Sequence, residues 1–183
     1  MKRSCIFILA IFIISMTMPV LAQVEPWIEQ SVPGIKYGSG LFKDPLGRFS
    51  MNIPSGWMGY SEVKGGPVQF VVKKKDFFAS CLIKIMQIEQ GFTMEKFKTF
   101  ILSDDVDPKK VKVLSDTEVK LDGISARCLH LIQQDMIADI YYLIKGREGY
   151  IIHFDTNISA YDTFKNEFKT TIDSFKFGQT SQK

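Results

Sequence analysis

The feature that most constrains this fold is a pair of segments flanking the dipeptide Asp122-Gly123. The segments, KVKVLSDTEVKL and ISARCLHLIQQ, alternate apolar and polar residues as a half-buried β-strand does. Asp and Gly tolerate the positive φ angles that a two-residue hairpin turn requires. The turn fixes the register, because a slip of one residue would carry every side chain to the opposite face. The sequence therefore predicts a β-hairpin centred on Asp122-Gly123.

The predicted register gives this hairpin one largely apolar face and one face with an opposite-charge pair, a combination that stabilises antiparallel strands. The expected pairs are Leu121 with Ile124, Val119 with Ala126, Thr117 with Cys128 and Ser115 with His130 on one face, and Glu118 with Arg127 and Leu114 with Leu131 on the other.

Other strand patterns flank the hairpin along the chain. IADIYYLIK and GYIIHFDT follow it and extend it to a meander of four strands. FFASCLIKIMQI, residues 77–88, is largely apolar at both odd and even positions, which is typical of a strand covered on both sides. VQFVVKKK from Val68 and the alternating FSMNI, which Pro54 ends, predict two further strands.

Two helices are expected between and after these strands. Thr93 can cap a helix in which Met94, Phe97 and Ile101 recur at helical spacing. Ser159 and Asp162 resemble a capping box before a second helix, which carries apolar residues at the same spacing, and SFKF would be a short closing strand. Strands and helices do not alternate strictly, so we expect an α+β fold: a mostly antiparallel sheet flanked by helices.

The N-terminus has the pattern of a secretory signal peptide. Lys2 and Arg3 precede an apolar run over residues 5–14, and small residues follow near Ala22. The run is shorter than the roughly 20 residues of a membrane-spanning helix, which favours cleavage near Ala22 over a retained anchor. The expected organisation is a signal peptide (1–22), an extended lead-in (23–40), a folded domain (41–177) and a flexible tail (178–183).

Export and charge limit the expected partners. Removing Lys2 and Arg3 from the 23 basic residues leaves 21 against 20 acidic ones, so the mature net charge is +1. An exported, nearly neutral chain is a poor candidate for nucleic-acid binding. The run Lys73-Lys74-Lys75 has two interpretations: a solvated strand end that discourages edge-to-edge pairing, or a peripheral contact with anionic lipid.

The candidate catalytic residues form only isolated pairs. His130 shares a predicted face with Cys128 and Ser115, and His153 shares one with Asp155. Pairs of this kind are more often structural than catalytic. The sequence has no nucleophile elbow, phosphate-binding glycine loop or metal-ligand spacing, so we expect no enzyme and no cofactor.

Cys81 and Cys128 are the two cysteines left after signal cleavage. In an exported protein they could form a disulfide, or they could remain free thiols packed as small apolar residues. Both alternatives stay open at the level of sequence, because a bridge requires Cα atoms within about 7 Å.

The segment PSGW, residues 54–57, follows the strand that Pro54 ends. Trp57 is expected to anchor the strand exit in the core. If it were instead exposed beside Tyr60, it would make a contact hot spot. The candidate contact region therefore contains Trp57, Tyr60 and the loop through Gly65 and Gly66.

Five segments together match the pattern of a known superfamily: the opening DPLGRFSMNIPSGW, the helix TMEKFKTFI, the strand pair around LDGISARCLHL, the strand pair YYLIKGREGYIIHF and the closing FKTTIDSFKF. Over residues 41–177 the chain thereby resembles the PsbP/Mog1/DcrB-like superfamily. The resemblance implies a central antiparallel sheet with helices on both faces, and an accessory or binding role. Known relatives include an extrinsic photosystem subunit, a GTPase-binding protein and bacterial envelope proteins, so fold alone selects no partner.

The expected function is a non-catalytic exported domain, periplasmic or extracellular, that contacts a protein partner in the envelope. The alternative is a carrier of a small apolar ligand, which the 15 Phe, 6 Tyr and 2 Trp residues suggest.

Overall fold

The computed structural model describes residues 34–74, 77–104 and 110–178, all within the unit Pro33–Lys183. The predicted signal peptide and residues 179–183 of the predicted tail lie outside the described residues. Among the residues described, no helix combines the length and apolar character needed to cross a membrane.

Most of the described residues form β-strands in two sheets. The larger sheet has eight strands in the order β1-β4-β5-β6-β10-β9-β8-β7, and the smaller has three in the order β11-β3-β2. All recorded pairings are antiparallel, which confirms the predicted α+β class. The strands are β1 (Ile35–Tyr37), β2 (Gly40–Lys43), β3 (Phe49–Ile53), β4 (Met58–Ser61), β5 (Val68–Lys74), β6 (Phe77–Gln87), β7 (Val111–Leu121), β8 (Ile124–Gln133), β9 (Met136–Lys145), β10 (Glu148–Asn157) and β11 (Lys176–Phe177).

The predicted hairpin is confirmed. Asp122 and Gly123 have φ angles of 48° and 81° and connect β7 to β8 with Leu121 opposite Ile124. The four-strand meander is also confirmed, since β7 to β10 are successive neighbours in the sheet. Strand β6 lies in the interior of the large sheet, between β5 and β10, as the two apolar faces of this strand indicated.

One predicted pair of the hairpin is wrong. Leu131 lies opposite Val113, not Leu114, and the register resumes with Ser115 opposite His130. Leu114 is the extra residue of a β-bulge, which inserts one residue into one strand and bends it locally. On the charged face, Arg127 lies opposite Glu118 as predicted, but its Nε donates to Asp116 at 2.7 Å, whereas Glu118 is 4.0 Å away.

Both predicted helices are present: α3 (Met94–Asp104) and α4 (Tyr161–Asp173). Thr93 caps α3 as expected, because its Oγ1 accepts a hydrogen bond from Lys96 N at 3.3 Å. The predicted capping box of α4 is wrong. Its N-cap is Ala160, with no side-chain cap, because the 3₁₀ turn Ile158–Ala160 runs directly into the helix.

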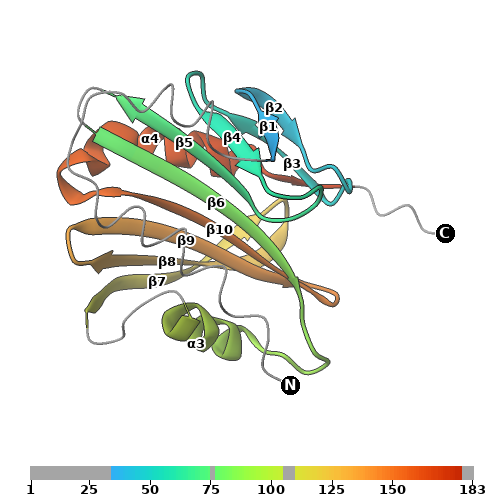
Figure 1. Ribbon diagram of the computed structural model, residues 1–183. Helices are drawn as coiled ribbons and strands as arrows, with labels where there is room; N and C mark the ends of the chain where they lie inside the picture. The colour runs from blue at the N-terminus through green and yellow to red at the C-terminus, as the bar shows by residue number, and fades with distance from the viewer. Residues whose placement is uncertain (1–33, 75–76, 105–109, 179–183) are drawn as a thin grey trace. The chain divides into compact units, whose positions relative to one another are not determined.

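The two helices cover opposite faces of the large sheet (Figure 1). Phe97 and Ile101 of α3 pack on one face, against Leu129, Ile140 and Tyr142. The other face is covered by α4 together with the small sheet. β11 pairs with β3, so the chain after α4 closes this outer layer. The layer lies over β5, β6 and β10, whereas the exposed side chains of β7 extend beyond it.

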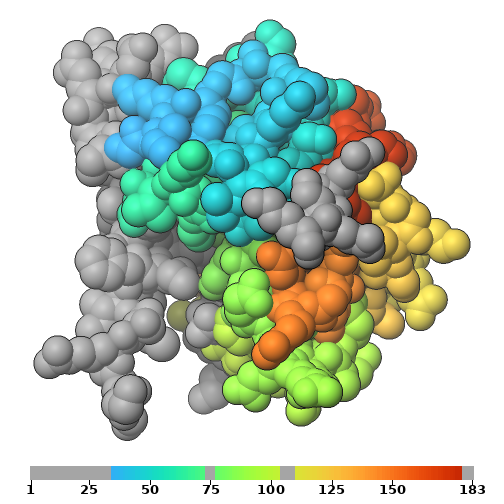
Figure 2. All heavy atoms as spheres, turned by 90° about the vertical axis from the view of Figure 1, so that its right-hand side faces the viewer, coloured from blue at the N-terminus to red at the C-terminus, as the bar shows by residue number. Residues whose placement is uncertain are grey.

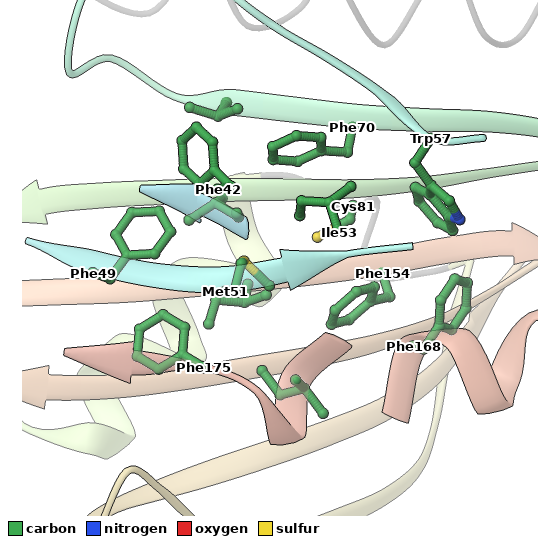
Figure 3. Packing of buried hydrophobic residues seen from close by; sticks show 14 of the residues in the cluster. Phe42, Phe49, Met51, Ile53, Trp57, Phe70, Cys81, Phe154, Phe168 and Phe175 are labelled. Carbon is green, nitrogen blue, oxygen red and sulfur yellow. The ribbon is translucent and has the colours of Figure 1, made fainter. Parts of the chain in front are cut away.

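Aromatic rings fill the space between the large sheet and this outer layer (Figure 3). Phe154 of β10 lies 5.0 Å from Phe168 of α4, and Phe49 stacks on Phe175 at 5.5 Å, both measured between ring centroids. Such pairs stabilise a fold beyond the burial of their area. The core is as aromatic as the composition indicates.

The structured region begins earlier than predicted. β1 lies within the expected lead-in, residues 23–40, and pairs with β4; β2 begins at its last residue. β1, β2 and β4 have only three or four residues each, too few to establish a period of two in the sequence.

Candidate functional site

The opening sequence DPLGR forms a tight turn between β2 and β3, built around a buried carboxylate. Asp44 Oδ2 accepts hydrogen bonds from Leu46 N and Arg48 N, each at 3.1 Å. The Arg48 guanidinium binds the same carboxylate through Nε and Nη2, at 2.8 and 2.7 Å. Burial of Asp44 opposes ionisation, but these bonds outweigh it and hold the pKa of the carboxyl below its usual range.

Arg48 also ties this turn to the loop between β4 and β5. Its Nη2 donates to Gly65 O at 2.8 Å. Gly65 has a φ of +76°, and a Cβ there would lie 2.5 Å from Leu46 Cδ1. A Cβ at Gly66 would lie 2.8 Å from Val63 Cγ2. The two glycines therefore allow Leu46 and Val63 to lie directly on the loop backbone.

We call residues 44–48 and 62–66 the loop platform. Its two large aliphatic side chains are well exposed: Leu46 is 60% and Val63 is 61% exposed. The platform lies at the end of the molecule that faces the viewer in Figure 2, where the green chain after β4 meets the blue and cyan chain of β2 and β3. Isolated exposed aliphatic residues are common, whereas these two lie on adjoining loops that a hydrogen bond from Arg48 joins.

Of the four residues predicted to form a partner contact, Gly65 and Gly66 lie in this platform and Trp57 does not. Trp57 is only 2% exposed and packs against Phe164 and Phe168, with ring centroids 6.5 and 6.2 Å away. Its Nε1 donates to Glu167 Oε2 at 2.7 Å. The core role expected of Trp57 is confirmed, and an exposed hot spot at this side chain is excluded.

Tyr60 lies on the opposite face of the large sheet from Trp57. Tyr60 lies opposite Gln69 of β5, and both side chains project to the face of the sheet that α3 covers. The Tyr60 hydroxyl donates to Gln69 Oε1. Burial, and secondarily the charge of Glu62, raise the pKa of Tyr60. Trp57 and Tyr60 therefore cannot form one surface, because alternate positions of a strand project to opposite faces.

Cys81 and Cys128 are free thiols, so of the two alternatives left open by the sequence the structure has the unbridged one. Cys81 lies on β6 and Cys128 on β8, with β10 and β9 between them. Three interstrand spacings amount to roughly 14 Å, about twice the reach of a disulfide. Burial raises the pKa of both thiols, that of Cys128 to about 11. Both remain protonated at neutral pH, so neither is a ready thiolate nucleophile.

His130 is held in a polar cluster on the α4 side of the sheet. His130 Nδ1 lies 2.6 Å from Asp139 Oδ1, and the hydroxyl of Tyr161 donates to Asp139 Oδ2 at 2.8 Å. The rings of His130 and Tyr161 are 5.5 Å apart. Burial, followed by the bond to Asp139 and its charge, raises the pKa of Tyr161. Sequence reasoning placed His130 correctly but missed both partners.

His153 and Asp155 share a face of β10, as predicted, with Nε2 and Oδ2 3.8 Å apart. Asp155 accepts a shorter bond, 2.7 Å, from Ser80 Oγ on the neighbouring β6. His153 and Asp155 therefore belong to a polar contact that joins β10 to β6 through Ser80. The Lys73-Lys74-Lys75 run lies outside the side chains that the structure describes.

The described residues offer little to a metal or an enclosed ligand. No group of three or more His, Cys, Asp or Glu side chains among them is arranged to hold a metal ion. An open hollow lies at the edge of the large sheet and includes two charged residues; its lining residues are Glu118, Val119, Lys120 and Ser125.

Comparison with known proteins shows the fold but no sequence family. No family model matches the sequence, and no curated protein matches it. Among solved structures, cyanobacterial PsbP (CyanoP) from Synechocystis sp. PCC 6803 is similar with a TM-score of 0.57 and 18% identity, over 80% of this chain and 97% of that one. A mutant of the protein Mog1 gives a TM-score of 0.58 at 10% identity, over 79% of this chain and 98% of its own.

A protein of unknown function from Pseudomonas aeruginosa is also similar, with a TM-score of 0.53 and 14% identity, over 75% of this chain and 96% of that one. These matches span nearly the whole of the three solved chains. The predicted resemblance to the PsbP/Mog1/DcrB-like superfamily is thereby confirmed in its fold: this chain has the fold of PsbP and Mog1.

Proposed function

We propose that this chain is an exported binding domain that contacts a protein partner in the cell envelope through the loop platform. The observation that carries the proposal is the exposure of Leu46 and Val63 on two loops that Arg48 holds together. The signal-peptide pattern of residues 1–22 supports export, and the accessory roles implied by the resemblance support a binding function.

The platform suits recognition because its backbone is fixed before a partner arrives. The Asp44 carboxylate, the Arg48 guanidinium and Gly65 O form a continuous set of hydrogen bonds across both loops. Ser61 Oγ and Gly66 N both donate to Val63 O, which closes the second loop on itself. A surface that loses little conformational freedom on binding retains more of its contact energy as affinity.

The experiment compares complexes recovered from the protein's own envelope fraction by native mass spectrometry. The test variant is Leu46→Ser with Val63→Ser, and the control is Ile158→Ser, an exposed aliphatic residue just after β10, at the opposite end of that strand from the β9–β10 turn. Burying one aliphatic side chain contributes about 1.5–3 kcal/mol, so each serine should weaken binding at least about tenfold. The proposal requires a complex that the double variant loses and the control keeps.

A further inference from the structure

Three side chains used in hydrolytic chemistry lie in one row across neighbouring strands of the large sheet. Ser115 of β7 is opposite His130 of β8, and His130 is opposite Asp139 of β9. Directly opposed residues of antiparallel strands project to the same face, with Cβ atoms about 4.5–5.5 Å apart. Across the row, a serine that can act as nucleophile is followed by a histidine that can act as base and by an aspartate that can orient the histidine. This is the order in which these three residue types cooperate in acyl transfer.

Asp139 fixes the orientation of the imidazole. It is buried, and its two oxygens are both engaged, one by His130 Nδ1 at 2.6 Å and the other by the Tyr161 hydroxyl at 2.8 Å. A carboxylate accepts hydrogen bonds, so the proton in this contact is on Nδ1, and in the neutral ring the lone pair is then on Nε2. Tyr161, at the start of α4, acts as a positioning residue that holds the carboxylate in place.

The bond to Asp139 also sets which edge of the ring is turned toward β7. In an imidazole ring the Cδ2–Nε2 bond is the edge opposite Nδ1, so a ring whose Nδ1 binds Asp139 on β9 turns its Cδ2–Nε2 edge toward β7, where Ser115 lies opposite His130. Ser115 is exposed, and β7 is the last strand of the sheet. A substrate can therefore approach this side chain from solvent.

A β-bulge lies directly before Ser115. Leu114, the residue immediately before Ser115, has no counterpart in the β7–β8 register. The extra residue of a bulge is left out of the ladder, and bulges are enriched next to active sites.

We propose that Ser115, His130 and Asp139 form an acyl-transfer site that hydrolyses carboxylic esters. Ser115 Oγ bonds to the ester carbonyl carbon while its proton passes to His130 Nε2. The bond from that carbon to the alcohol oxygen then breaks, and the leaving oxygen takes the proton from Nε2. Water attacks the acyl-serine in the same manner, releasing the carboxylic acid and restoring the hydroxyl. Cys128, on the same face, is not the nucleophile because its thiol remains protonated at neutral pH.

A fluorophosphonate probe tests this site covalently. Ser115 Oγ bonds to phosphorus, fluoride leaves, and His130 takes the hydroxyl proton. Peptide mapping of the full chain should place the adduct on Ser115, and Ser115→Ala should remove it. His130→Gln should slow labelling about 100-fold, in the range expected for loss of a general base. Ser125→Ala is the control, because Ser125 is exposed on the same hairpin two positions before Arg127, on the opposite face from His130.

Hydrolysis of p-nitrophenyl acetate gives a second readout, in which Ser115→Ala should abolish the turnover that Ser125→Ala retains. Ser115 is exposed, so its alanine variant should fold, and a thermal melt of each variant checks this. An adduct on any other serine, labelling of Ser115 that is equally fast in His130→Gln, or full ester turnover by Ser115→Ala would each overturn the proposal. The site lies on a different part of the domain from the loop platform and does not depend on it.

Discussion

The guanidinium of Arg48 binds both oxygens of the Asp44 carboxylate, with Nε 2.8 Å from Oδ2 and Nη2 2.7 Å from Oδ1. A two-pronged contact of this kind fixes both partners in direction as well as in distance. The same Nη2 donates to Gly65 O, so the turn before β3 and the loop before β5 are joined by a hydrogen bond. This relationship holds together the two loops through which we propose that a partner is contacted.

Replacing Asp44 by Asn should lower the free energy of unfolding by about 2–4 kcal/mol, because the buried end of the guanidinium loses its counter-charge. Urea unfolding at pH 7 measures the loss. The control is Asp173→Asn, which removes an exposed pair with Lys169 and should change stability by less than about 0.5 kcal/mol. Equal effects of the two variants would show that the Asp44 pair contributes no more than a surface pair.

The same carboxylate should make stability depend on acid pH. A group whose pKa is lower in the folded state than in the unfolded state stabilises the fold above its unfolded pKa, about 4, and loses that contribution as pH falls through the folded value. The pKa of Asp44 is lowered in this way. The stability difference between the wild type and Asp44→Asn should therefore shrink between about pH 5 and pH 2. Urea unfolding across that range would contradict this if the difference stayed constant.

Trp57 gives a test of the core. Trp57→Ala should cost about 3–5 kcal/mol, since it leaves a cavity against Phe164 and Phe168. Trp57→Phe keeps an aromatic ring but removes the bond to Glu167, and it should cost less. Chemical denaturation of both variants measures the order. A neutral Trp57→Ala would contradict the buried position of this side chain.

Local sequence patterns predicted those helices and strands in which apolar residues recur at a regular spacing. The Asp122-Gly123 turn and the flanking alternation give the hairpin register from Leu121 to Ser115, because turn type and period are both local properties. The bulge escaped prediction because Val113 and Leu114 are both apolar, so the pattern does not show which is the extra residue. β1, β2 and β4 escaped it because they are short.

The candidate sites depend on contacts between distant parts of the chain. Leu46 is exposed because its turn folds around Asp44 and rests on Gly65. This contact joins two loops that are separated in the sequence by β3 and β4. The Asp-Pro-Leu-Gly-Arg sequence was a usable signal, since an acid and a base four residues apart can close a turn. Asp139 was another: a lone carboxylate among apolar residues in IADIYY predicts bonded partners, which are His130 and Tyr161.

Cys81 and Cys128 should remain reduced under oxidising conditions. Alkylation after unfolding without a reductant should modify both Cys81 and Cys128, since they are too far apart to bridge. In the native protein, Cys128 should react slowly at pH 8 and faster as pH rises toward about 11, because burial raises its pKa. A disulfide-linked peptide containing Cys81 and Cys128 would contradict the strand order.

The most direct test of the proposed binding function is a photo-cross-linking measurement from the loop platform itself. A photoreactive residue at Leu46 should give a discrete cross-linked protein in the native envelope, and a probe at Ile158 should not. The same cross-link should disappear when Val63→Ser is added. If the probes at Leu46 and Ile158 gave the same cross-linked proteins, or if the probe at Leu46 gave no cross-linked protein in the folded chain, the claim that the loop platform contacts a partner would be contradicted.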